Sequence, residues 1–433
     1  MAGDSDVGAT RWHAISGLGV PECADWHYNL LVLDTPSAGP IAWLASACFA
    51  LVSCGASSET QGTVMRDSSG VTIVENGDSA PAWSVQNQLT IGVTSGDVPY
   101  QLDRVRDATR LPDGRIVVVN GGSADLRFFG TDGTHLETVG RSGSAPGEFR
   151  APSSVHRRGD TLLVWDFPRI ALLTTSGEVI GTEGLERMRF VMTLQDHGMP
   201  FGVERLADGS FMMRVVPDSE PRPAGEYRPE IGLVWMSADL AQSHFIGQFP
   251  DIRHVNVGTA AQPMSMAVPM SAHVLYAAGG DPMRVYISWS DSLEVLQYST
   301  DGRLLRSIRG THAPVPVSED ALSEVYEQRR ALLTQSLPEG EVERRLNLIP
   351  NPETYPALDA LDVDERGWIW ARHYLTASDS TTRFSIFDTT GALRGEVEIP
   401  SRFEPLEVTV DYVLGVSRGE VDVERVRLYA IVR

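Results

Sequence analysis

Several polar side chains of types that bind metals or move protons stand at the ends of apolar stretches or within long connections. They are Asn120, Asp166, Asp196, His197, His254, Asp291 and His373. Carboxylate and amide oxygens suit Ca²⁺, which takes roughly six to eight oxygen ligands, and a neutral imidazole can act as a base or a ligand. If the fold gathers these side chains, they could form a metal-assisted hydrolytic site.

The same residue types also have a structural interpretation. Asp and Asn are frequent in turns because their side chains hydrogen-bond to nearby backbone amides. The chain has no Gly-x-Ser-x-Gly nucleophile elbow. The glycine pairs Gly121-Gly122 and Gly279-Gly280 lack the Lys and the following helix of a phosphate loop. We therefore predict no catalytic residue and no cofactor, with Ca²⁺ as the open alternative.

Composition excludes several classes of function. All 36 basic residues are Arg, so no Lys nucleophile is available. Against 57 acidic residues they leave a net charge of −21, which disfavours nucleic acid as a partner. The three cysteines, Cys23, Cys48 and Cys54, all precede the body of the chain, so disulfides and thiolate metal sites are excluded there.

An apolar run over 41–53 ends at Cys54. As a helix it would reach only about 20 Å, which is too short for a hydrocarbon core of about 30 Å. Its length suits a signal peptide, and Leu51-Val52-Ser53-Cys54 resembles the lipobox of bacterial lipoproteins. That resemblance implies removal of 1–53 and a lipid on Cys54; the alternative is a buried helix with an incidental Cys.

The segments beside this run complete the prediction of location. Only Arg11 supplies positive charge upstream, so we expect residues 1 to about 35 to come from a mis-assigned start. Residues 54–69 are small and polar, as in a flexible tether. Together these features predict a membrane lipoprotein of the bacterial cell envelope, on the periplasmic or the cell-surface side.

From residue 105 onward the chain repeats a short apolar strand, an Asp-Gly turn and another strand. The clearest repeat covers 111–140, where Asp113-Gly114 and Asp132-Gly133 separate strands. This is the antiparallel meander of a propeller blade. Six such units can be assigned, at 105–140, 154–177, 204–236, 273–309, 358–399 and 406–432. The sequence thus predicts an all-β, six-bladed β-propeller over 70–433, with four-stranded antiparallel blades.

Two details of this architecture can be predicted further. The last unit has only three strands, and an N-terminal strand should complete it because an open edge invites aggregation. We favour Val71-Thr-Ile-Val74 for that strand over Leu89-Thr-Ile91. The segment 311–355, between blades four and five, should contain a helix capped by Ser318. That insertion either covers the central channel as a lid or packs against the rim.

One linker carries a family resemblance. The stretch Gly140-Arg-Ser-Gly-Ser-Ala-Pro-Gly-Glu-Phe-Arg-Ala-Pro152 resembles the connection between blades of NHL-repeat propellers. The stretches 356–370 and 411–416 resemble TolB-like six-bladed propeller lipoproteins of bacteria, whose function is unassigned. The resemblance implies a fold and not an activity. Six-bladed lactonases gather Asp, Glu, Asn and sometimes His from different blades around Ca²⁺ at the channel mouth, which makes a metal-assisted, lactonase-like or esterase-like hydrolase the alternative function.

The loops indicate where a site should lie. Because neighbouring strands are antiparallel, successive connections alternate between the two faces of the ring, so the tight turns share one face and the long loops the other. Long connections are commonly functional. We therefore expect a lipid-anchored binding or scaffold module for a protein, peptide or small molecule. Its candidate long-loop residues are Asn120, Asp166, His197, His254, Asp291 and His373.

Overall fold

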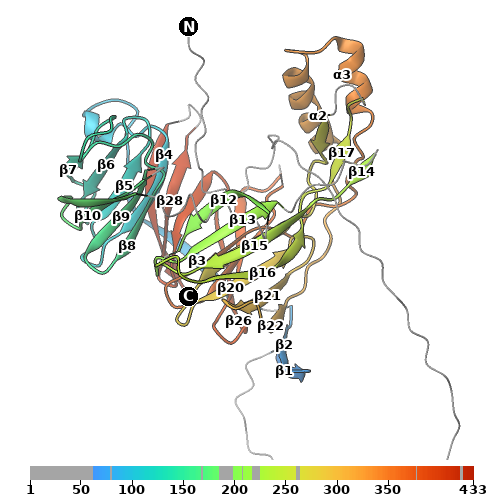
Figure 1. Cartoon of the computed structure of the whole chain (residues 1–433), viewed down its shortest axis with the longest axis horizontal. Helices are drawn as coiled ribbons and strands as arrows, with labels where there is room; N and C mark the ends of the chain where they lie inside the picture. The colour runs from blue at the N-terminus through green and yellow to red at the C-terminus, as the bar shows by residue number, and fades with distance from the viewer. Residues whose placement is uncertain are drawn as a thin grey trace, which may run out of the picture.

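The computed structural model describes residues 62–78, 80–166, 169–184, 198–206, 208–216, 225–259, 264–376, 378–419 and 423–433. Regular structure in these residues is almost entirely β-strand, with two α-helices (Figure 1). The signal region, Cys54 and His197 lie outside the described residues. Within the described ranges, no helix combines the length and the apolar character needed to cross a bilayer.

Most strands belong to units of four antiparallel strands. The first unit is β4 (Val105–Arg110), β5 (Ile116–Asn120), β6 (Asp125–Phe129) and β7 (His135–Val139). The second is β8 (Ser154–Arg158), β9 (Thr161–Asp166), β10 (Arg169–Thr174) and β11 (Val179–Gly184). The third is β12 (Met199–Arg205), β13 (Phe211–Val216), β15 (Glu230–Met236) and β16 (Ser243–Pro250).

The C-terminal half continues the pattern. The fourth unit is β19 (Val274–Gly279), β20 (Arg284–Trp289), β21 (Glu294–Ser299) and β22 (Leu304–Arg309). The fifth is β23 (Leu358–Val363), β24 (Ile369–His373), β25 (Thr381–Phe387) and β26 (Leu393–Pro400). The sixth is β27 (Phe403–Val408), β28 (Tyr412–Arg418) and β29 (Glu424–Val432), joined by β3 (Ala82–Ile91) from the N-terminal side.

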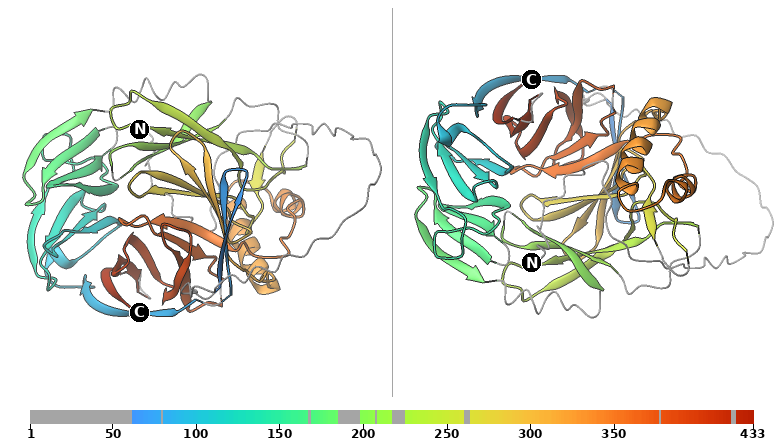
Figure 2. Two further views of the ribbon diagram at one scale, coloured as in Figure 1. Left: turned by 90° about the horizontal axis from the view of Figure 1, so that it is seen from below. Right: turned by 90° about the horizontal axis from the view of Figure 1, so that it is seen from above.

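The units are arranged around a common centre (Figure 2). Their first strands are innermost, since β4 contacts β8 and β27, and β19 contacts β23. Each consecutive pair of units shares a buried apolar cluster. The sixth and first units share one as well, through Leu414 and Phe129. We call each such interface between neighbouring units a seam, and the seams therefore continue around the whole ring. This is the arrangement of a β-propeller.

The expected closing strand is wrong. β3 pairs antiparallel with β29, with Leu89 opposite Leu428, so the less favoured choice, Leu89–Ile91, completes the sixth unit. β3 has ten residues and can match the nine of β29. It buries Trp83 and Ile91 at the two adjoining seams. Because the middle of β3 is polar, its sequence does not indicate this role.

Val71–Val74 instead lies in a hairpin on the fourth unit. β2 (Val71–Asn76) pairs parallel with β22 and antiparallel with β1 (Thr63–Ser68). Ser69 and Gly70 turn the chain with φ of 57° and 85°, the left-handed values of a tight hairpin turn. Thr63–Ser68 is therefore a strand, which corrects the expectation that the whole of 54–69 is a flexible tether.

The predicted helical insertion between the fourth and fifth units is present, as α2 (Glu319–Leu333) and α3 (Glu339–Leu346). Ser318 caps α2 by accepting a hydrogen bond from the Ala321 amide at 3.2 Å. Both helices belong to a separate apolar cluster containing Val257, Leu333 and Val342. A small sheet formed by β14 (Glu226–Tyr227), β17 (His254–Asn256) and β18 (Ser265–Ala267) completes this helical unit.

The helical unit stands at one side of the ring when viewed along its axis (Figure 2). Its cluster combines residues of the segment between the third and fourth units with residues of the segment after the fourth. Of the two roles considered for the insertion, packing at the rim describes this arrangement better than a lid over the centre. A short 3₁₀ turn, η1 (Val98–Tyr100), lies between β3 and β4.

Candidate functional site at the long-loop face

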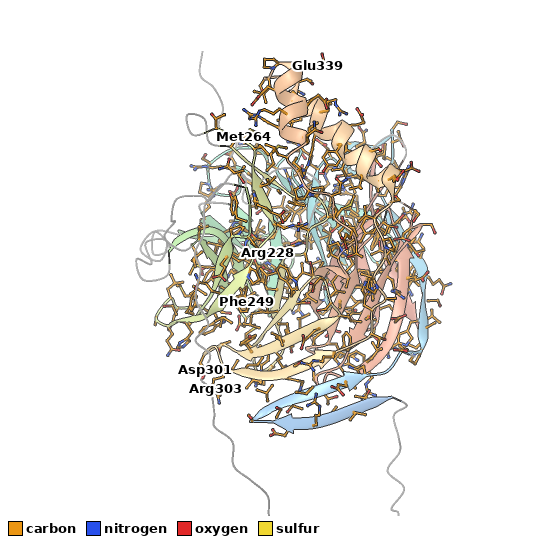
Figure 3. The ribbon with its side chains drawn as sticks, turned by 90° about the vertical axis from the view of Figure 1, so that its right-hand side faces the viewer. Arg228, Phe249, Met264, Asp301, Arg303 and Glu339 are labelled. Atoms are coloured by element: carbon orange, nitrogen blue, oxygen red, sulfur yellow. The ribbon has the colours of Figure 1, made fainter. Side chains whose placement is uncertain are left out.

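The tight turns lie on one face of the ring. Gly114, Gly302 and Gly391 adopt φ of 87°, 85° and 86° in these turns, a left-handed conformation that glycine adopts without steric cost. In Figure 3, Asp301 and Arg303 of one such turn lie well away from Glu339 at the start of α3. The face opposite the tight turns is called the long-loop face below.

Three of the candidate residues occupy equivalent positions in three different units. Asn120, Asp166 and His373 are the last residues of the second strand in their units, at the long-loop end. All three are buried. The structure therefore places them on equivalent positions of different units, and each one makes its own local contacts.

Asn120 holds a loop in place. Its Oδ1 accepts a hydrogen bond from the Asp103 amide at 2.8 Å, and its Nδ2 donates to Ser123 Oγ at 2.6 Å. Nearby, Arg127 donates to the carbonyls of Val98, Pro99 and Gln101, which fixes the segment leading into β4. Asn120 thus has a structural role in the folded ring.

Asp166 has a comparable role in the second unit. Its carboxylate is 0% exposed. Oδ1 accepts hydrogen bonds from the amides of Arg150 and Ala151 at 2.8 and 2.7 Å, and Oδ2 pairs with the Arg169 guanidinium at 2.8 Å. Arg169 in turn donates to the carbonyls of Ser144 and Glu148. Both carboxylate oxygens are occupied by donors that position the linker between units.

His373 forms a buried chain of hydrogen bonds whose direction can be assigned. Arg383 Nη2 lies 3.2 Å from His373 Nδ1 and can only donate, so Nδ1 accepts. The proton therefore sits on Nε2, which donates to Ser385 Oγ at 2.8 Å, while Ser385 donates to Glu396 Oε1 at 3.2 Å. A serine nucleophile would donate to its histidine base. Here the histidine donates to the serine, so Ser385 is not arranged to give up its proton to His373.

A second histidine lies beside His373. The two rings, His312 and His373, are 6.3 Å apart, and His312 Nε2 is buried without a hydrogen-bond partner. Burial, Arg383 and His312 lower the pKa of His373 to about 3. Burial and Arg383 also lower the pKa of His312. Both imidazoles are consequently neutral near pH 7.

The other two described candidates lie toward the helical unit. His254 belongs to β17, stacks on Tyr227 with ring centroids 5.7 Å apart, and lies 3.3 Å from Ser265 Oγ. Asp291 is exposed after β20 and acts electrostatically on Arg228, which stacks on Trp289 at 4.5 Å. Figure 3 shows Arg228 between the helical unit and the ring. In the described part of the chain, no group of three or more His, Cys, Asp or Glu side chains could hold a metal.

A pocket lies at the long-loop end of the sixth unit. It has a volume of about 390 Å³ and is lined by Ser401, Arg402, Phe403, Glu404, Val416, Arg418 and Gly419. These residues come from the start of β27 and the end of β28, which are neighbours because the Arg418 amide donates to the Arg402 carbonyl at 3.2 Å. Phe403 is buried in the seam with the fifth unit and Val416 in the seam with the first, so the accessible side chains of the pocket are mainly the charged ones.

Glu404 is positioned from the fifth unit. The guanidinium of Arg372 lies between two carboxylates, 3.2 Å from Glu404 Oε1 and 2.5 Å from Asp359 Oδ1. Burial tends to lower the pKa of Arg372, but Asp359 and Glu404 raise it overall, so the guanidinium stays charged. This Asp359, Arg372 and Glu404 triad crosses from the innermost strand β23 to the innermost strand β27.

Arg418 is positioned by a neighbouring acid on β29. Its Nη2 is 3.2 Å from Glu424 Oε1, and Glu424 Oε2 accepts a hydrogen bond from the Val105 amide at 2.6 Å. The side chain of Arg418 nevertheless remains 56% exposed. One side of the guanidinium is thus fixed while the rest faces the pocket and solvent.

None of these pocket residues is among the sequence candidates. They carry no motif, and Arg418 becomes a neighbour of Arg402 and Glu404 only through the pairing of β27 with β28. The one available signal is position, since Arg402 and Glu404 lie at the start of an innermost strand. The sequence analysis concentrated on the ends of second strands, where the side chains are used for loop structure.

Comparisons with known proteins give distant likenesses. No family model and no curated protein matches the chain. Among solved structures, a putative exported protein from Bacteroides fragilis is 11% identical with a TM-score of 0.42, over 83% of this chain and 99% of that one. A DUF4221 family member from Bacteroides vulgatus is 9% identical with a TM-score of 0.45, over 82% and 99%. Virginiamycin B lyase from Staphylococcus aureus is 9% identical with a TM-score of 0.37, over 81% and 99%.

Proposed function

We propose that this chain is an exported, lipid-anchored, six-bladed β-propeller that binds a ligand at its long-loop face. The observation that carries the proposal is the pocket at the start of the innermost strand β27, whose lining includes the charged residues Arg402, Glu404 and Arg418. Pockets of a few hundred Å³ with a small number of convergent polar groups are typical of ligand sites. The four-stranded units would be the six blades, and NHL-type linkers would connect at least the first two.

The site chemistry favours binding over hydrolysis. The carboxylate of Asp166 is occupied by backbone and guanidinium donors, and the hydrogen bonds of His373 run in the wrong direction to activate Ser385. Among the side chains that line the pocket, Glu404 is the single carboxylate. A Ca²⁺-assisted hydrolase would call for several convergent oxygens at that point.

The position of the N-terminal hairpin gives the proposed anchor a geometric consequence. β1 and β2 lie at the opposite end of the molecule from α2 and α3 in two perpendicular views (Figures 1 and 3). Eight Cα-to-Cα steps separate Cys54 from Gly62, which reach at most about 30 Å. A lipid on Cys54 would hold the hairpin end near the bilayer, and the long-loop face would point away from it toward soluble ligands.

A thermal-shift screen of amino acids, short peptides, sugars and carboxylic acids tests the proposal on protein carrying Cys54→Ser, which avoids the lipid. Binding raises the melting temperature through mass action. A ligand of this face should lose its stabilising effect in Arg402→Glu and keep it in Arg303→Glu, a matched charge reversal in a tight turn on the other face. The opposite pattern, or stoichiometric Ca²⁺ required for binding, would overturn the proposal.

A further inference from the structure

Two arginines of the pocket lie opposite each other on neighbouring strands. Phe403 pairs with Ser417. The next position outward places Arg402 opposite Arg418, whose amide donates to the Arg402 carbonyl at 3.2 Å. Side chains of directly opposite residues in an antiparallel pair project from the same face of the sheet, with Cβ atoms roughly 5 Å apart. Both arginines line the pocket, so it is built around a pair of like charges.

Acidic side chains balance only one of these two charges. Arg418 Nη2 lies 3.2 Å from Oε1 of Glu424, which occupies the opposite position on β29. Glu404 also lines the pocket, but its carboxylate accepts from Arg372 of the fifth unit. Arg402 is exposed, and its side chain makes no hydrogen bond or ion pair with another described residue. Like charges on directly opposite residues are destabilising, so this pair gains from a negative counter-charge on its exposed side.

Arg418 is held in position before any ligand arrives. Glu424 fixes one side of its guanidinium, and the Val105 amide of the first unit donates to Glu424 Oε2 at 2.6 Å. The Arg418 side chain is still 56% exposed, so the remaining N–H donors of its guanidinium can reach a ligand. A group fixed in advance loses little conformational entropy on binding, so its charge can contribute to affinity.

The ligand chemistry that matches two adjacent guanidinium groups is an oxyanion. We propose that the pocket takes a small organic acid whose carboxylate bridges Arg402 and Arg418. The planar guanidinium donors match the two oxygens of a carboxylate, and charge-assisted hydrogen bonds of this kind are stronger than neutral ones. This inference rests on the proposed function and names the class of ligand for that site.

The pocket and the charge of the whole chain limit the rest of the ligand. A volume of about 390 Å³ is in the range of small-molecule sites. Phe403 and Val416 are buried in different seams, so the accessible wall is polar and suits an acid with a polar body. The net charge of −21 repels polyanions, which favours a ligand with a single negative charge.

An acid and its isosteric amide separate charge from shape. N-acetylglycylglycine has a polar body and one carboxylate, and its C-terminal amide is neutral. Calorimetry on the Cys54→Ser protein should show the acid binding about tenfold more tightly than the amide, the size of one charge-assisted contact. Added sodium chloride should reduce this difference, because salt screens exposed charges. Equal affinity of the acid and the amide, or no binding of the acid, would overturn the inference.

Two variants test whether the carboxylate binds to Arg402. Arg402→Gln should lower the affinity for the acid about tenfold and leave that for the amide unchanged. Arg303→Gln, the same substitution in a tight turn on the other face, is the control and should change neither. Arg402→Gln should also keep or raise the melting temperature of the unliganded protein, since it removes a like-charge neighbour of Arg418. A lower melting temperature, or an unchanged affinity for the acid, would contradict the assignment.

Further ligands separate this inference from the broader one. Inorganic phosphate is the second anion tested, because guanidinium groups also match phosphate. If phosphate binds through Arg402 more tightly than N-acetylglycylglycine, the assignment to a carboxylate fails. If the acid does not bind while a neutral ligand from the screen depends on Arg402, the inference fails and the proposed function stands. If the bound ligand depends on Arg303 at the tight turns, the proposed function fails as well.

Discussion

Glu407 accepts a hydrogen bond from the backbone amide of Arg110 at 2.7 Å, and so connects the last blade-like unit to the first. Two other acids make the same kind of contact across a seam: Asp107 accepts from the Val155 amide at 2.9 Å, and Glu424 accepts from the Val105 amide. In each case a carboxylate satisfies an amide of a neighbouring innermost strand, whose inner edge has no further strand to pair with. These carboxylates are therefore part of the contacts that hold neighbouring units of the ring together.

Glu407 should make stability depend on pH. Burial raises its pKa to about 7 from an ordinary value of 4.5, although the hydrogen bonds from Arg110 and Tyr412 act in the lowering direction. The folded state thus binds the proton more tightly than the unfolded state, so this contribution to stability is full below pH 4.5 and is lost as the pH rises through 7. Glu407→Gln should remove that loss.

The measurement is urea unfolding at half-unit steps from pH 4.5 to 8. The free energy of unfolding of Glu407→Gln should increase relative to the unsubstituted protein as the pH rises. Glu137→Gln, on the exposed part of β7, is the control and should follow the unsubstituted protein. A constant difference across the range would contradict a raised pKa at Glu407.

A second prediction concerns the stability of chains that lack the N-terminal strands, including the closing strand β3. A chain that starts at Ala80 lacks β1 and β2 and exposes the outer edge of β22, which should cost roughly 2 kcal/mol and leave a cooperative transition. A chain that starts at Gly92 also lacks β3, which opens two seams of the ring. That chain should lose its cooperative melt in calorimetry. Equal stability of the two truncations would contradict the role assigned to β3.

The local features of this fold could be predicted and the distant pairings could not. The Asp-Gly turns at Gly114 and Gly302 and the Ser318 cap depend on neighbouring residues, so they are visible in sequence. The partner of β29 lies more than 300 residues away, and nothing local to Leu89–Ile91 distinguishes it from Val71–Val74 as the closing strand. Pairing depends on strand length and seam packing, which local hydrophobicity does not report.

The long-loop face as the place of a functional site stays a prediction, and the pocket on that face contains none of the candidate residues. Second-strand ends such as Asp166 were chosen because their residue types can bind metals, yet the incoming linker uses those same oxygens. The pocket arginines were missed because exposed charges at strand ends have no distinguishing pattern. Their proximity follows from the register of β27 and β28, where Glu404 stands opposite Val416.

The histidine pair should lower the stability of the folded state as the pH falls, whereas Glu407 should lower it as the pH rises. Burial is the main cause that lowers the pKa of both His312 and His373 below the ordinary value of 6.5. The unfolded state therefore binds protons first, and this contribution to stability is full above pH 6.5 and declines as the pH falls toward 3. The groups facing the pair are Arg383, which disfavours protonation, and Ser385 with Glu396 behind it.

Replacing His312 with Gln should reduce the loss of stability between pH 6.5 and 4 in thermal melts. His244→Gln is the matched control, since His244 lies on the outer strand β16, where its ring stacks on Trp235 of β15. An acid dependence that is identical in the His312 and His244 variants would count against the buried pair as its source.

The lipid anchor is tested at Cys54. One acyl chain binds a bilayer only weakly, with a constant of roughly 10⁴ M⁻¹, and further chains are needed for firm attachment. Cys54→Ser should therefore abolish incorporation of labelled fatty acid and release the protein from the membrane fraction together. Cys48→Ser is the control and should change neither. Membrane retention in Cys54→Ser would contradict the lipobox interpretation.

Substitutions of Asp166 test whether this strand-end acid has a structural role or binds a metal. Asp166→Ala leaves two buried amides and the Arg169 guanidinium without their acceptor, which should cost about 3 kcal/mol in urea unfolding because unpaired buried donors and charges are penalised. Asp166→Asn keeps one oxygen for the amides of Arg150 and Ala151 and should cost less. Bound metal, measured by elemental analysis, and any stabilisation by Ca²⁺ should be the same in all three proteins, because both carboxylate oxygens already have protein donors. Loss of a stoichiometric metal in Asp166→Ala, with little change in stability, would show that the carboxylate serves as a ligand.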